Sequence, residues 1–109
     1  MENCFTFVCS ELEKHKIKVP IEWGGFSRVN KKLFIVDYKY FLENKLHYEF
    51  FYSFCNKVST AQKNDIILDN DGIGIAINRF KYMTIKDKNN KHCLSDIVSG
   101  QTILRVNNG

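Results

Sequence analysis

The first part of the chain carries apolar residues at helical spacing. Phe5, Val8, Cys9 and Leu12 recur at three- and four-residue spacing, and the opposite face carries Glu11, Glu13 and Lys14. This periodicity predicts an amphipathic helix over Cys4–Lys16, with Asn3 able to cap its start.

Short apolar runs separated by glycine follow this helix. Ile21–Trp23 and Phe26–Val29 flank Gly24–Gly25, an arrangement typical of a hairpin. Leu33–Val36 reads as a compact strand, and Asp37 is suitably placed to cap a following helix.

The longest helical pattern runs from Tyr38 to Ser59. The residues that share its apolar face are Tyr40, Phe50, Phe51, Phe54, Cys55 and Val58. Leu42, Leu46 and Tyr52 depart from this division. Two explanations stay open: the helix bends near Asn44–Lys45, or it packs on two sides.

Alternating apolar residues in the last third of the chain predict strands. Ile66–Leu68 and Ile73–Ile77, joined by Asp69–Gly72, form the first expected hairpin. Its alternation would next bring Arg79 and Lys81 inward, so we expect a bulge or turn near Asn78 and Arg79 that changes the buried face.

A second hairpin is expected from Phe80–Lys86 and the residues from His92 onward. Leu94–Ser99 is compatible with a strand or with one helical turn that ends at Gly100. Thr102–Val106 predicts a final strand.

Together these elements predict one α+β domain over residues 1–109. We expect an antiparallel sheet drawn mainly from the second half, packed against the long aromatic-rich helix and the N-terminal helix. The length, the 44% of hydrophobic residues and the 14% of aromatic residues suit a single domain with its own core.

The N-terminus shows no secretory signal, and no apolar run is long enough to span a bilayer. A chain of this size folds without disulfides, so Cys4, Cys9, Cys55 and Cys93 are expected to be reduced thiols. These features predict a cytoplasmic protein that has no membrane association.

Patterns typical of metal or cofactor sites are incomplete. Aligned on Gly72, a calcium-binding loop would need ligands at Ile67 and Asn78, which do not suit the ion. The Gly72–Gly74 pair continues into a strand and not into a phosphate-binding helix. The cysteines and histidines lack zinc-ligand spacing. We therefore expect no cofactor and no metal.

His47 lies on the apolar face of the long predicted helix, where a hydrogen bond to Glu43 or to a backbone carbonyl would satisfy it. The sharper hypothesis pairs His47 with His92 as acid and base of a small ribonuclease. No local motif marks either histidine as catalytic.

The net charge is concentrated in one segment. Between Arg79 and Lys91, five cationic residues and one acidic residue, Asp87, give a net charge of +4, equal to that of the whole chain. The candidate partner-binding residues are Arg79, Lys81, Lys86, Lys88 and Lys91. Phe80 and Tyr82 alternate with the first two, as stacking aromatics would on a nucleic-acid-binding sheet. Buried aromatics with solvated lysines would give the same pattern, and we expect Phe80 or Tyr82 to be core.

The sequence favours a non-enzymatic protein that binds a macromolecular partner, such as an inhibitor, an immunity (antitoxin-like) protein or an adaptor. Because its excess charge is positive, a protein partner should present an acidic patch. Nucleic-acid binding through residues 79–91 is the first alternative, and the ribonuclease hypothesis is the second.

Overall fold

Helices dominate the first half of the fold and strands the second. The computed structural model describes residues 4–19, 26–29, 32–35, 38–70, 72–86 and 91–107. The elements are α1 (Cys4–Lys14), β1 (Phe26–Val29), β2 (Lys32–Ile35), α2 (Tyr38–Glu43), α3 (Leu46–Tyr52), β3 (Cys55–Val58), β4 (Ile66–Asp69), β5 (Gly72–Ala76), β6 (Lys81–Lys86), β7 (Lys91–Asp96) and β8 (Thr102–Val106). The α+β class is confirmed.

Six strands form one antiparallel sheet in the order β3-β8-β4-β5-β6-β7. The two hairpins expected in the second half are present as β4–β5 and β6–β7, and β8 inserts between β3 and β4. The segment that could have been a strand or a helical turn continues β7 to Asp96. Gly100 then takes a left-handed conformation, with φ at 95°, before β8 begins.

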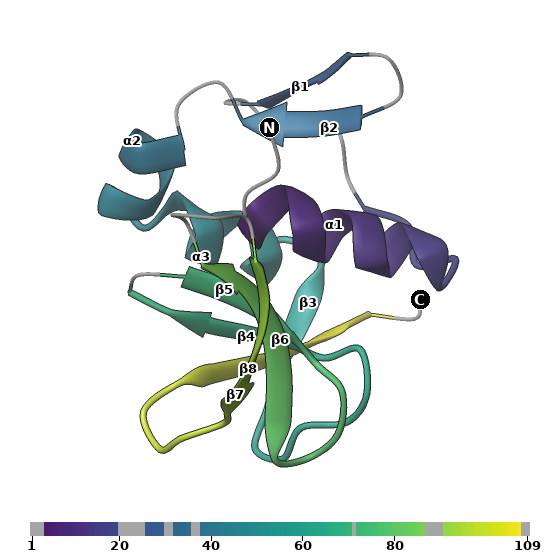
Figure 1. The fold of residues 1–109 in the computed structure, drawn as a ribbon, viewed down its shortest axis with the longest axis vertical. Coiled ribbons are helices and arrows are strands. Elements are labelled where there is room, and N and C mark those ends of the chain that lie inside the picture. The colour runs from purple at the N-terminus through teal and green to yellow at the C-terminus, as the bar shows by residue number, and fades with distance from the viewer. Residues whose placement is uncertain are drawn as a thin grey trace.

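α1 lies between two layers, as Figure 1 shows, with the β1–β2 pair on one side and the six-stranded sheet on the other. Every residue from Cys4 to Cys9 is buried, which a helix with one apolar face would not achieve. The second layer explains this burial, because β2 contacts α1 on the side away from β5 and β6. Asn3 lies outside the described residues.

The single long helix over Tyr38–Ser59 is not observed, and that prediction was wrong. Two short helices, α2 and α3, stand in its place. The Asn44 side-chain amide donates to the carbonyl of Tyr40, and Lys45 has a left-handed backbone with φ at 55°. A left-handed residue ends the helical hydrogen-bond ladder, so the chain changes direction at the point where a bend was one alternative.

The last residues of the expected helix form β3 instead. Cys55 pairs with Val106 and Val58 pairs with Ile103 across the sheet. Cys55 is buried while Asn56 and Lys57 are exposed. Helical periodicity in this stretch was outweighed by pairing with β8, a strand from the other end of the chain.

Phe5 occupies the centre of the main core, between the helices and the sheet. Its ring makes edge contacts with Phe41 and Phe50, each with ring centroids 5.0 Å apart. Ile73 and Ile75 of β5 belong to the same core as Phe50 and Phe51 of α3, although the helix that lies against β5 is α1. Edge-to-face rings add stabilisation beyond the apolar area that they bury.

A smaller cluster covers part of the sheet face that the helices leave open. It consists of Ala61, Ile67 and Ala76, with Tyr82, Ile97 and Ile103 packed against it. β4 is consequently buried on both faces, which a sheet covered by helices on one face alone would not require.

The predicted hairpin around Gly24–Gly25 cannot be assessed, because 21–25 lie outside the described residues. The strand Phe26–Val29 is present, and its partner is β2. Asp37, the expected helix cap, also lies outside the described part of the chain.

Candidate functional site

A tight turn joins β5 to β6 at the position where the alternation was expected to break. The Asn78 side-chain oxygen accepts hydrogen bonds from the backbone N–H groups of Phe80 and Lys81, at 2.8 and 2.9 Å. The N–H of Ile77 donates to the carbonyl of Lys81 across the turn. Asparagine in this role closes the turn through its side chain and fixes the directions of the residues that follow.

The turn projects an aromatic ring into solvent. Phe80 is 64% exposed, and the guanidinium carbon of Arg79 lies 5.0 Å from the centroid of its ring. A guanidinium over an aromatic face is attracted to the ring, by about 0.5–1 kcal/mol at an exposed site, so the two side chains hold each other in place. Phe80 is therefore not part of the core. We call Arg79 and Phe80, with the turn residues Ile77 and Asn78, the hairpin tip.

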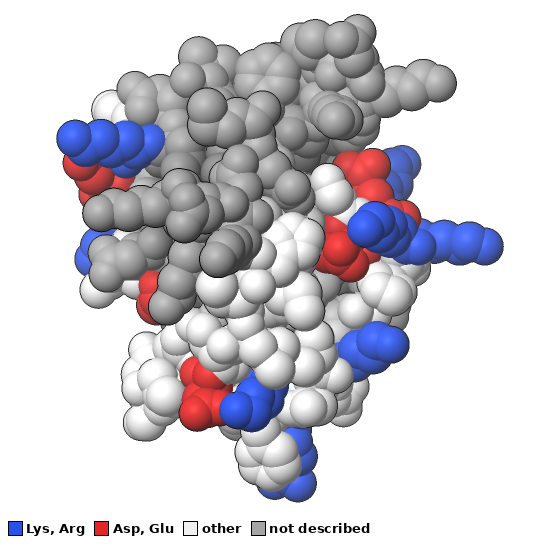
Figure 2. Space-filling view, in the orientation of Figure 1, with Lys and Arg blue, Asp and Glu red and all other residues white. Residues whose placement is uncertain are grey.

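Lys81 differs from Arg79 because a carboxylate neutralises it. Its Nζ donates to Asp96, the residue directly opposite on β7. Both side chains are well exposed, so water screens the pair and it contributes little stability. Figure 2 shows acidic and basic atoms side by side low on the sheet, with uncharged surface around them.

The remaining candidate cations lie at the opposite end of β6. Lys86 pairs with Lys91 at the last position of the β6–β7 ladder, and Lys88 lies outside the described residues. Five steps along an extended strand separate Lys81 from Lys86 by about 17 Å. Among the described candidates, Arg79 and Lys81 therefore lie at one end of β6, and Lys86 and Lys91 lie at the other.

Tyr82 is the partly buried member of the aromatic pair. It packs against the small cluster behind the sheet, and its hydroxyl oxygen lies 3.2 Å from the Gln101 side-chain amide nitrogen, which donates to it. A Cβ on Gly74 would overlap the Tyr82 ring, so glycine makes room for it. Of the two aromatics, only Tyr82 packs against a buried cluster, and its own ring is partly and not fully buried.

His47 has a structural position. Its ring is fully buried beside Phe41 and Tyr48, and Nε2 donates to the backbone carbonyl of Asp69 at 2.8 Å. Burial lowers its pKa, while the Asp69 carbonyl opposes this effect. The expected bond to a backbone carbonyl is confirmed, with Asp69 as the acceptor. A fully buried ring has no access to a polymeric substrate, which leaves the ribonuclease hypothesis without its first histidine.

The other groups with possible chemistry are dispersed. His92 is on β7, with its ring 4.7 Å from that of Phe7. Cys4, Cys9 and Cys55 are buried thiols, Cys93 is partly exposed, and burial raises the pKa of Cys55 to about 12. Within the described ranges no three histidine, cysteine, aspartate or glutamate residues gather closely enough to hold a metal ion.

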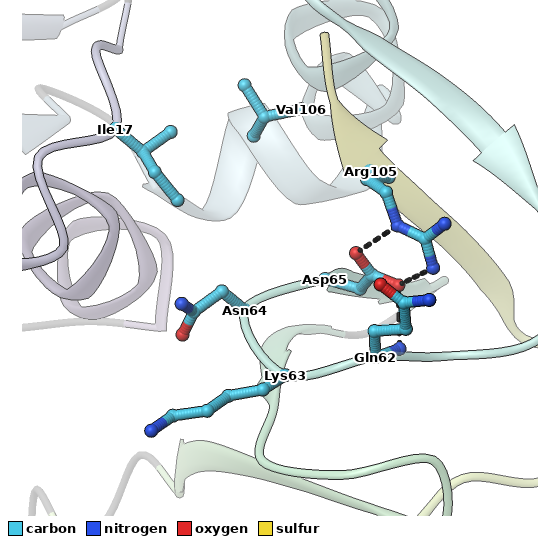
Figure 3. A pocket seen from close by; sticks show the side chains of 7 residues that line it. All are labelled: Ile17, Gln62, Lys63, Asn64, Asp65, Arg105 and Val106. Atoms are coloured by element: carbon cyan, nitrogen blue, oxygen red, sulfur yellow. Dashed lines mark hydrogen bonds and ion pairs between the residues drawn. The ribbon is translucent and has the colours of Figure 1, made fainter. Parts of the chain in front are cut away.

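A small cavity of about 200 Å³ opens beside β8 (Figure 3). At its floor, the Arg105 guanidinium faces the buried carboxylate of Asp65, with N–O distances of 3.0 and 2.8 Å. The backbone N–H of Gln62 also donates to Asp65. The cavity is smaller than typical ligand pockets. Because internal partners already satisfy the Asp65 carboxylate, this cluster serves the fold.

Three surface residues near the hairpin tip escaped the analysis of the sequence. Leu94 and Val98 are 53% and 57% exposed, and Asp96 neutralises Lys81. The sequence of β7 contained a pattern that could have indicated an exposed edge strand. His92, Leu94 and Asp96 alternate with Cys93, Ser95 and Ile97, so neither face of the strand is consistently apolar. Such a strand is typical of a sheet edge.

Comparison with protein-family models, with curated proteins and with solved structures found no match to this chain. In the part of the chain that the structure describes, no helix has the length and apolar character needed to cross a membrane.

Proposed function

We propose that this protein is a non-enzymatic binding protein that recognises an acidic protein surface through its hairpin tip. The observation that carries this proposal is the exposed Phe80 ring held beside the guanidinium of Arg79. Aromatic and arginine side chains are the residues most often found at the energetic centre of protein interfaces. Val98, equally exposed, supplies additional apolar surface from the loop before β8.

The positive charge of Arg79 at the hairpin tip favours an acidic partner. Arg79 makes no ion pair with any described residue, whereas Lys81 is neutralised by Asp96. A carboxylate on the partner would pair with Arg79 while an apolar or aromatic side chain covers Phe80. Lys86 and Lys91, at the far end of β6, would accelerate encounter with the same acidic partner through long-range attraction.

Binding of single-stranded nucleic acid is the second candidate, and the exposure of Phe80 favours it, because an exposed ring offers a stacking platform. Two features favour protein over nucleic acid. Tyr82 does not stand beside Phe80 as a second platform, since it packs into the small cluster. Among the described cations, Arg79 and Lys81 also lie at the opposite end of β6 from Lys86 and Lys91.

Inhibitor, immunity (antitoxin-like) and adaptor proteins all fit a small binding domain of this kind. We place the protein in the cytoplasm, because four cysteines present as thiols suit a reducing compartment. An immunity-type role would require a toxin with an acidic and not a basic binding surface.

Comparative affinity capture tests the proposal. The wild type, Phe80→Ala, Arg79→Glu and Tyr52→Ala are immobilised in parallel, and the retained protein and nucleic acid are identified. Tyr52 is a matched control, because it is an exposed aromatic residue on α3, away from the hairpin tip. We expect one protein to be retained by the wild type and by Tyr52→Ala, and to be lost by the other two variants.

The alternatives give different results. Retention of nucleic acid that falls with salt and with Phe80→Ala would favour the second candidate. Equal retention of every partner by all four proteins would show that the hairpin tip is solvated surface and would overturn the proposal.

A further inference from the structure

β7 forms one edge of the six-stranded sheet, and among the described residues it pairs with β6 alone. The N–H of Ile97 donates to the carbonyl of Phe80, which shows which positions of β7 face β6. In an antiparallel ladder these positions alternate. The backbone groups of Cys93 and Ser95 therefore point toward β6, while those of His92, Leu94 and Asp96 point to the open edge.

We infer that two copies of this chain associate through β7, pairing antiparallel so that the two sheets become one. Only residues whose backbone groups point to the open edge can exchange backbone hydrogen bonds with the second copy. The symmetric register places Leu94 opposite Leu94 of the second copy and His92 opposite Asp96. Three such pairs, each exchanging two backbone bonds, give roughly six intermolecular hydrogen bonds.

This register extends an apolar row of the sheet. Ile75 pairs with Met83, and Met83 pairs with Leu94, on the face that bears α1. Leu94 is 53% exposed at the end of this apolar row. Pairing Leu94 with Leu94 of the second copy would join two such rows into one. The two exposed side chains would then bury each other, and this contact between neighbouring strands would stabilise the dimer.

The neighbouring pairs can form side-chain hydrogen bonds. Lys81 binds Asp96 on one side, and the second copy brings its His92 to the other side. The two carboxylate oxygens allow Asp96 to accept hydrogen bonds from both. By symmetry the pair between His92 and Asp96 occurs twice, once on each side of the Leu94 contact.

The opposite edge of the sheet is less suited to the same pairing. On β3 the N–H of Asn107 donates to the carbonyl of Phe54, so Cys55 and Lys57 are the positions whose backbone faces outward. Lys57 is exposed there. Symmetric pairing at that position would set two lysines against each other, and a lysine at an edge is a common protection against strand addition.

The seam does not include Arg79 or Phe80, so the dimer and the proposed partner site stand independently. Sedimentation of the purified wild type over a concentration series tests the dimer. We expect the mass to rise from the 12.8 kDa of one chain toward twice that value. Leu94→Lys should abolish this rise, because it sets two cations opposite each other. Val98→Lys, at an equally exposed position outside the seam, should dimerise like the wild type.

Cross-linking tests the register itself. Facing residues in a hydrogen-bonded pair have Cα atoms about 5.5 Å apart, within reach of a disulfide. Leu94→Cys should therefore yield a covalent dimer on mild oxidation in a Cys93→Ser background, and Val98→Cys in the same background should not. Thermal melting verifies that each variant is folded. A wild type that stays monomeric at its highest soluble concentration would overturn the inference. So would a dimer that survives Leu94→Lys and leaves Leu94→Cys unlinked.

Discussion

The imidazole of His47 donates from Nε2 to the backbone carbonyl of Asp69 at 2.8 Å, while its Nδ1 is buried without a partner among the described residues. The contact joins α3 to the end of β4, 22 positions further along the chain. It requires the neutral ring, because a proton on Nδ1 would be a buried charge with no acceptor. The histidine thus stabilises the fold only while it is uncharged.

Stability should therefore decline in mild acid. Burial lowers the pKa of His47 below its ordinary value of 6.5. As the pH falls below about 6.5, the unfolded chain binds a proton that the native state does not. The free energy of unfolding should then fall by about 1.4 kcal/mol per pH unit. Urea unfolding measured in steps of about 0.5 pH unit, from about pH 7.5 down to about pH 5.5, gives this slope. His47→Gln should remove it and His92→Gln should keep it. Equal slopes in both variants would contradict the assignment.

The ion pair between Asp65 and Arg105 should be far more important to stability than the pair between Lys81 and Asp96. Asp65 is 2% exposed, and removing the guanidinium would leave its carboxylate buried and unpaired. Arg105→Met should cost about 2–3 kcal/mol, below the usual loss for a fully buried pair because Arg105 is partly exposed. Lys81→Met should cost less than about 1 kcal/mol. Chemical unfolding of both variants gives the comparison, and equal losses would contradict it.

Adding a side chain at Gly74 should lower the free energy of unfolding while the Tyr82 ring lies over it. An added Cβ would overlap the Tyr82 ring and approach the carbonyl oxygen of Met83 to 3.0 Å. Gly74→Ala should cost about 1–3 kcal/mol through overpacking. In a Tyr82→Leu background the same change should cost less, because the ring is gone. A double-mutant cycle measures this coupling, and strict additivity of the two losses would contradict the contact.

The four thiols should differ in reactivity. Cys93 is partly exposed, whereas Cys4, Cys9 and Cys55 are buried, and burial raises the pKa of Cys55 to about 12. An aromatic disulfide reagent should modify one thiol rapidly in the native protein and the others only on unfolding. Cys93→Ser should abolish the rapid phase. A reductant should leave the melting temperature nearly unchanged, and a large drop would reveal a disulfide.

The sequence determined the α+β class and the strands of the second half, because period-two alternation and Asp-Gly or Asn turns act over a few residues. The turn at Asn78 followed from the same local logic, since charged residues could not continue the buried face of β5. The bond from His47 to a backbone carbonyl was also foreseeable from its apolar surroundings.

Only the tertiary structure decided the remainder. Cys55–Val58 has a helical pattern, yet it became β3 because β8 supplied a ladder of hydrogen bonds from more than forty residues away, as Cys55 pairs with Val106. Phe80 and Tyr82 are two positions apart in the sequence, yet only Tyr82 packs over the sheet, because Gly74 on the neighbouring strand makes room for its ring. Among the described cations of this segment, Lys81 and Lys86 lie apart because they stand at opposite ends of the extended strand β6. Local propensity cannot encode such outcomes, since each depends on a neighbour that the fold brings from elsewhere in the chain.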